Sequence, residues 1–129
     1  MFSTPQVNIY SEDVARSVEL YRGLGFEETF RTPSEGEPIH VELELDGFKL
    51  GIASVESAIA DHGLDRDLTK PGRGMEIALW TDDADAAFAR LVAGGARPLS
   101  EPHDWLESLR VAWVADPDGN PIELVERRA

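Results

Sequence analysis

The feature that most constrains the fold of this chain is an internal repeat. Asp13 and Asp83, each at the expected start of a helix, are 70 positions apart, and Gly25 and Gly95, each at the expected end of a helix, are separated by the same interval. A third landmark, the dipeptide Asp-Gly, occurs at 46–47 and at 118–119, an interval of 72 that two inserted residues explain. The repeat predicts two copies of one supersecondary unit.

Each copy has the pattern of a βαβββ module. In the first copy, alternating polar and apolar residues predict a strand over 6–10, and Asp13 is the expected cap of a helix whose apolar face ends at Gly25. Three strands are expected to follow, over 26–31, 40–45 and 48–53, and Asp46-Gly47 is a strong hairpin signal between the last two.

The second copy repeats this order. A strand over 76–81, a helix over 84–93 capped by Asp83, and strands over 97–99, 109–115 and 121–127 are expected, with residues 101–105 as a loop. A short helix over 55–62 and a polar, glycine-rich segment over 63–74 join the two copies.

These elements predict an α+β fold made of one domain over 1–129. Its first module covers about 5–54, its linker about 55–74 and its second module about 75–127. Two twisted sheets of this kind are expected to form an incomplete, barrel-like cup with an inner face lined by both modules.

Charge and composition narrow the possible partners. The formal net charge is −13, so nucleic acid and anionic membrane surfaces would be repelled, whereas a neutral or cationic small molecule is compatible. There is no cysteine and no window near the roughly 18 apolar residues of a membrane span. The N-terminal residues lack the pattern of a signal peptide, so a cytoplasmic location is expected.

Two sequence blocks resemble the vicinal oxygen chelate superfamily. The first comprises Asp-Val-Ala-Arg-Ser at 13–17, Tyr21 and Leu-Gly-Phe at 24–26, and the second, more specific block is Asp-Pro-Asp-Gly-Asn-Pro-Ile-Glu-Leu at 116–124. This superfamily includes glyoxalase I, extradiol dioxygenases, fosfomycin resistance enzymes and bleomycin resistance proteins. The resemblance spans nearly the whole chain and implies a small-molecule ligand in the cup and a homodimer, but the fold alone does not fix the activity.

The resemblance also implies four metal-ligand positions, which fall on Gln6, Gly51, Glu76 and Glu123. An amide oxygen and two carboxylates suit a hard divalent cation, but Gly51 has no side chain and none of the four is histidine. We therefore expect a glyoxalase or bleomycin-resistance-like protein that binds a small organic molecule without a complete catalytic metal site and without a cofactor. The alternative is a lyase, isomerase or dioxygenase-type enzyme that uses Gln6, Glu76 and Glu123 with one Mg²⁺, Mn²⁺, Ni²⁺ or Zn²⁺ ion.

The remaining candidates belong to the expected inner face. His103 and Trp105 lie in the segment 101–105, which the resemblance places beside the cup, and both are expected to contact the ligand. Glu76 and Glu123 form either a cation-binding pair or a general-base pair, unless Glu123 is neutralised by a group such as Arg73. The sequence assigns no catalytic residue, and it favours packing roles for Trp80 and Trp113 and surface roles for His40 and His62.

Overall fold

The computed structural model describes residues 4, 6–64 and 75–128. The chain divides into two compact units, Met1–Lys70 and Pro71–Ala129. Residues 65–74 of the expected linker, Arg73 among them, lie outside the described residues.

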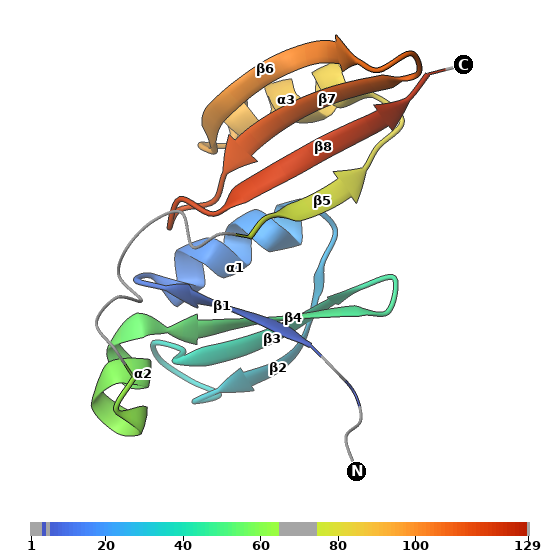
Figure 1. The fold of residues 1–129 in the computed structure, drawn as a ribbon. Coiled ribbons are helices and arrows are strands. Elements are labelled where there is room, and N and C mark those ends of the chain that lie inside the picture. Colours follow the sequence, from blue (N-terminus) through green and yellow to red (C-terminus); the bar gives the residue numbers. More distant parts are fainter. Residues whose placement is uncertain (1–3, 5, 65–74, 129) are drawn as a thin grey trace. The chain divides into compact units, whose positions relative to one another are not determined.

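Unit 1 is a four-stranded mixed sheet with two helices (Figure 1). Its elements are β1 (Val7–Ser11), α1 (Val14–Gly23), β2 (Glu27–Thr32), β3 (His40–Leu45), β4 (Phe48–Ser54) and α2 (Val55–His62). The strand order is β1-β4-β3-β2, with β1 parallel to β4 and the other pairs antiparallel.

Unit 2 has the same topology (Figure 1). Its elements are β5 (Ile77–Trp80), α3 (Ala84–Ala93), β6 (Arg97–Trp105), β7 (Leu109–Ala115) and β8 (Pro121–Arg127). The strand order is β5-β8-β7-β6, again with one parallel pair, β5 and β8. The α+β class and the two βαβββ modules are therefore confirmed.

The strand register supports the alignment of the two copies. Asn8 of β1 lies opposite Gly51 of β4, and Ala78 of β5 lies opposite Glu123 of β8. Asn8 and Ala78 are 70 positions apart and Gly51 and Glu123 are 72 apart, the same intervals as in the sequence landmarks. Gly51 and Glu123 therefore occupy equivalent places in the two sheets.

In each unit, one face of the sheet forms the core with a helix. Successive strand residues point to opposite faces, so the buried side chains of the helical side alternate along each strand. In unit 1 they include Ile9, Val41, Leu43, Leu50 and Ile52, which share this side with Val18 and Tyr21 of α1. In unit 2 they include Ala112, Val114, Ile122 and Leu124, covered by α3, which lies behind β6 and β7 in Figure 1.

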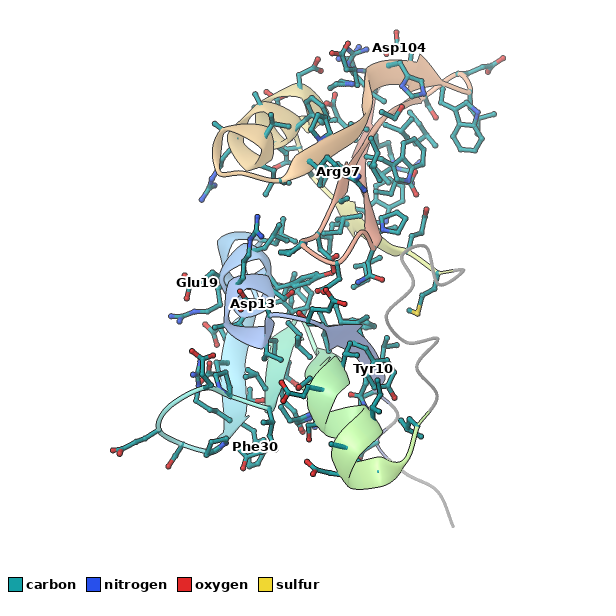
Figure 2. All side chains as sticks on the ribbon, turned by 90° about the vertical axis from the view of Figure 1, so that its left-hand side faces the viewer. Tyr10, Asp13, Glu19, Phe30, Arg97 and Asp104 are labelled. Carbon is teal, nitrogen blue, oxygen red and sulfur yellow. The ribbon has the colours of Figure 1, made fainter. Side chains whose placement is uncertain are left out.

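The expected helix caps and hairpin are confirmed. The carboxylate of Asp13 accepts from the backbone N–H of Arg16 at 3.1 Å, and that of Asp83 accepts from Ala86 at 3.0 Å. Figure 2 shows Asp13 at the start of α1. Asp46 and Gly47 both have positive φ angles, 50° and 82°, as a tight two-residue turn between antiparallel strands requires.

The expected loop over 101–105 is wrong, because these residues belong to β6. The prediction ended this strand at Leu99, whereas the observed strand continues through Pro102, which cannot donate a hydrogen bond within a sheet. However, β6 is an edge strand, and its register shifts between Pro98 and Ser100 and between Ser100 and His103. Edge strands and bulges are the places where a sheet tolerates Pro102.

Among the described residues, no helix has the length and apolar character needed to cross a membrane.

Candidate functional site

Two carboxyl groups lie on the face of the unit 2 sheet that points away from α3. Glu123 lies in the middle of β8, between Ile122 and Leu124, which face α3, so its side chain points to the opposite face. Glu76 lies immediately before β5, near enough to Glu123 to act on its carboxyl group. Burial, followed by the nearby carboxyl group of Glu76, raises the pKa of Glu123.

Trp113 completes this group. It lies opposite Glu123 on β7, and its indole N–H donates to Glu76 Oε1 at 3.2 Å. The imidazole of His103 stacks on the indole, with ring centroids 6.3 Å apart, and its Nδ1 lies 2.7 Å from the carbonyl oxygen of Glu101. We call Glu76, Glu123, Trp113 and His103 the carboxyl–tryptophan site.

Sequence reasoning missed Trp113, which it treated as a packing residue. A signal was available, because Asp116 and Gly119 mark the turn between β7 and β8 and strand pairs can be counted outward from it. The pair next to the turn is Ala115 with Pro121, and the next pair on the same face is Trp113 with Glu123.

Trp105 is not brought together with the carboxyl pair. It is 52% exposed and pairs with Leu109, four residues along β7 from Trp113. Trp80 is 62% exposed, and the guanidinium of Arg127 lies 5.0 Å from the centre of its ring. Both indoles therefore lie on the surface of unit 2, outside the carboxyl–tryptophan site.

The corresponding positions in unit 1 have a different chemistry. Gln6 lies immediately before β1, and its Nε2 donates to Asn8 Oδ1 at 2.8 Å. A Cβ atom built on Gly51 would lie 2.0 Å from Asn8 Oδ1 and 3.2 Å from His40 Cε1. The Asn8 amide therefore occupies the space that a side chain at position 51 would need.

These residues do not fit the four-residue metal set that the resemblance implies. Unit 2 supplies two neighbouring carboxyl groups, Glu76 and Glu123. In unit 1 the Gln6 amide is bonded to Asn8, and position 51 offers no ligand atom. Of the four positions, only Glu76 and Glu123 carry carboxyl groups, and this pair is able to neutralise a cation.

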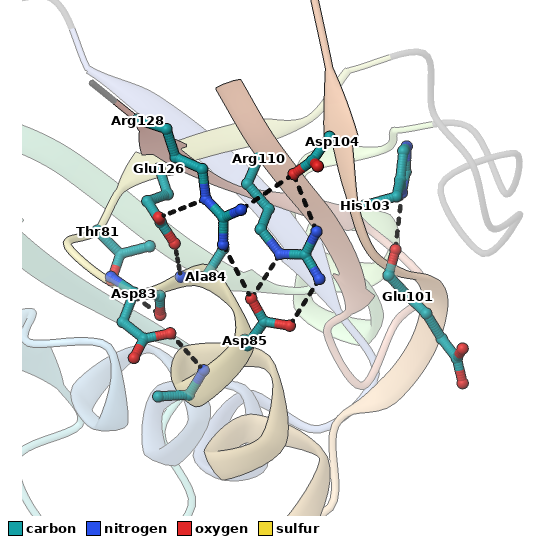
Figure 3. Close-up of polar contacts among 11 residues, drawn as sticks. Thr81, Asp83, Ala84, Asp85, Glu101, His103, Asp104, Arg110, Glu126 and Arg128 are labelled. Atoms are coloured by element: carbon teal, nitrogen blue, oxygen red, sulfur yellow. Dashed lines mark hydrogen bonds and ion pairs between the residues drawn. The ribbon is translucent and has the colours of Figure 1, made fainter. Parts of the chain in front are cut away.

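A second acidic group, Asp83, Asp85 and Glu126, has a structural role (Figure 3). The guanidinium of Arg110 binds Asp85 with two nitrogens and Asp104 with a third, and Arg128 binds Asp104 and Glu126. Hydrogen bonds from Arg110 lower the pKa of Asp85, and those from the Ala84 N–H and Arg128 lower the pKa of Glu126. These ion pairs connect the N-terminal turn of α3 to the sheet and stabilise its position.

Several solved structures share this fold. A glyoxalase-related enzyme from Fulvimarina pelagi is 24% identical, with a TM-score of 0.79, and the match covers 98% of this chain and 89% of that one. A superfamily member from Sphaerobacter thermophilus is 25% identical, with a TM-score of 0.71 and 98% coverage of both chains. TioX from Micromonospora sp. ML1 is 24% identical, with a TM-score of 0.71 and coverage of 97% and 99%.

No curated protein matches the chain at a significant level. The sequence profile of the Glyoxalase/Bleomycin resistance protein/Dioxygenase superfamily matches residues 4–124, nearly the whole chain. This chain therefore belongs to the Glyoxalase/Bleomycin resistance protein/Dioxygenase superfamily.

Proposed function

We propose that this protein binds a small organic cation with a planar aromatic ring system at the carboxyl–tryptophan site. The observation that carries the proposal is the grouping of two carboxyl groups and an indole, because Trp113 donates a hydrogen bond to Glu76 and lies opposite Glu123 across the strands. A bound cation would relieve the repulsion between the carboxylates, and its ring would stack on Trp113 or His103.

The charge of the whole chain supports this ligand class. A formal net charge of −13 raises the local concentration of cations and speeds their association. The indole of Trp113 is held by its hydrogen bond to Glu76, so little of its conformational freedom remains to be lost on binding.

The second candidate function is a metal-dependent lyase, isomerase or dioxygenase-type reaction. The specific observation in its favour is the same carboxyl pair, because two adjacent carboxylates are ligands that Mg²⁺ and Mn²⁺ prefer. The first candidate has more support, since Asn8 fills the space over Gly51 and unit 1 offers no third carboxylate or histidine at the aligned positions.

One set of titrations separates the two candidates. We expect 9-aminoacridine, a planar cation, to quench tryptophan fluorescence saturably, and the neutral ring system anthracene-9-methanol to bind at least about tenfold more weakly. Glu123→Gln should weaken 9-aminoacridine binding, whereas Trp105→Phe, which changes an indole outside the site, should not.

Calorimetric titration of Mn²⁺, Ni²⁺ and Zn²⁺ completes the comparison. Micromolar metal binding that disappears in Glu123→Gln, together with no saturable response to 9-aminoacridine, would favour the enzyme and contradict our proposal.

We further propose that the protein is a cytoplasmic homodimer. The lack of cysteine is compatible with a reducing compartment, and the family resemblance supports the dimer.

A further inference from the structure

The face of the unit 2 sheet that carries the carboxyl–tryptophan site continues toward the C-terminal end of β8. Residues that pair across neighbouring strands point to the same face of a sheet, and so do residues two apart along one strand. Val125 and Arg127 therefore follow Glu123 on this face, and Leu109 lies beside Arg127. At about 3.3 Å per residue, the Arg127 side chain leaves the strand about 13 Å from Glu123.

Arg127 is in contact with an indole rather than with a carboxylate. Trp80 pairs with Val125 and so lies on the same face, and the exposed guanidinium of Arg127 lies 5.0 Å from the centre of its ring. Within the part of unit 2 that the structure describes, Arg127 forms no ion pair, whereas its neighbour Arg128 binds Asp104 and Glu126. In a chain with 25 acidic and 12 basic residues, a guanidinium without a carboxylate partner keeps its capacity to bind an anion.

Apolar side chains separate the two charged ends of this face. Val111 and Val125 pair with each other in the middle, and their exposed fractions are only 1% and 5%. His103 pairs with Val111, and Trp80 with Val125, so an aromatic residue flanks the two valines on each side. The face thus has negative groups at one end, an apolar middle and a positive group at the other end. Charge complementarity favours a ligand whose two ends carry opposite charges.

We propose that the ligand of unit 2 carries a carboxylate as well as a cation, and that Arg127 binds this carboxylate. The cationic ring of such a ligand would occupy the carboxyl–tryptophan site, so this ligand class rests on the proposed function. The N–H groups of a guanidinium match the two oxygens of a carboxylate, and stacking on Trp80 restricts the Arg127 side chain before the ligand arrives. Arg127 is therefore the residue that selects a zwitterionic ligand over a simple cation.

The test compares three acridines, whose binding is followed by quenching of tryptophan fluorescence. The first, 6-(acridin-9-ylamino)hexanoic acid, has a carboxylate on a flexible chain, the second is the corresponding uncharged hexanamide, and the third is 9-aminoacridine, which has no chain. Without a contact to Arg127, the net charge of −13 would repel the carboxylate, and the acid would bind more weakly than the amide. We expect the opposite order, with the acid binding at least roughly threefold more tightly, as an exposed ion pair allows.

Two variants of equal net charge make the test specific. Arg127→Gln should reverse the order, so that the amide binds more tightly than the acid, and it should not weaken the binding of 9-aminoacridine. Arg128→Gln is the matched control, because Arg128 is already paired with Asp104 and Glu126, and it should keep the order of the wild type. Arg127 is exposed, so its replacement should leave the fold intact.

The outcomes separate this proposal from the proposed function. An acid that binds no more tightly than the amide, or a preference for the acid that persists in Arg127→Gln, would overturn the role of Arg127 even if 9-aminoacridine binds. Absence of 9-aminoacridine binding, together with a preference for the acid that Arg127→Gln abolishes, would overturn the proposed function and retain the role of Arg127. No saturable binding of any of the three acridines would overturn both.

Discussion

Glu123 and Glu126 are three residues apart on β8 and have opposite electrostatic environments. Glu123 faces away from α3, and its pKa is raised by burial and by Glu76. Glu126 faces α3, where the backbone N–H of Ala84 donates to its Oε1 at 2.8 Å, and its pKa is lowered. Successive side chains of β8 point to opposite faces of the sheet. Glu123 is therefore placed where it could meet a ligand, whereas Glu126 is placed where it stabilises the fold.

This difference predicts opposite effects of two matched substitutions. The raised pKa of Glu123 means that the folded state loses stability as pH rises through that pKa, so Glu123→Gln should slightly stabilise the free protein at pH 7. The gain should disappear below the ordinary pKa of glutamate, where the carboxyl group is protonated in both states.

Glu126→Gln is the control. Its lowered pKa stabilises the folded state above the ordinary pKa of glutamate, and this contribution is lost as pH falls, so the substitution should destabilise the protein at pH 7. Thermal unfolding at pH 4 and pH 7 measures both effects. A destabilising Glu123→Gln at pH 7 would contradict the environment described for the carboxyl pair.

At the scale of elements, α1 and α3 both begin with a capping aspartate, but the first turn of α3 is also bonded to a second carboxylate. At α1, Asp13 is the capping side chain, and its carboxylate accepts from Arg16. At α3, Asp83 accepts from Ala86, and Glu126 accepts in addition from Ala84. The start of α3 therefore has two carboxylates bonded to backbone N–H groups.

We therefore expect Asp13→Ala to cost more stability than Asp83→Ala. Loss of an N-cap typically costs about 1 kcal/mol, and this is the expected effect at Asp13. The loss at Asp83 should be smaller, because Glu126 still caps the helix and the repulsion within the acidic group decreases. Urea denaturation of both variants, with Asp13→Asn and Asp83→Asn as capping-competent controls, measures the difference, and equal losses would contradict it.

For the whole molecule, the excess of acidic groups has two opposite consequences. With 25 acidic and 12 basic residues, repulsion within the chain opposes folding, while the same field attracts cationic ligands. Added salt screens both effects, with a Debye length that falls from about 30 Å at 0.01 M to about 8 Å at 0.15 M.

Raising NaCl over this range should therefore increase the thermal stability and weaken 9-aminoacridine binding. Anthracene-9-methanol is uncharged, so its weaker binding should not change with salt, and it serves as the internal control. The measurements are thermal unfolding and the two titrations at each salt concentration. A cation affinity that is independent of salt would contradict electrostatic attraction as a cause of binding.

The sequence by itself determined the repeat, the α+β class and most element bounds. Asp13, Asp83, Gly25 and Asp46-Gly47 act through local backbone preferences, which neighbouring residues in the chain reveal. The extent of β6 was not predictable in this way, because a strand containing Pro102 forms only where β7 is available as a partner and the opposite edge is open.

The tertiary structure decided the chemistry of the positions that the sequence singled out. The sequence indicated Gln6, Glu76 and Glu123 through family motifs, but the contact of Trp113 with Glu76 depends on strand register and side-chain rotamers across 37 residues of chain. Likewise, glycine at position 51 reads as a missing ligand in the sequence, whereas the structure shows Asn8 in its place. Local backbone preferences determine where helices, strands and turns form. Which side chains come into contact is determined only by the pairing of strands that are distant in the sequence.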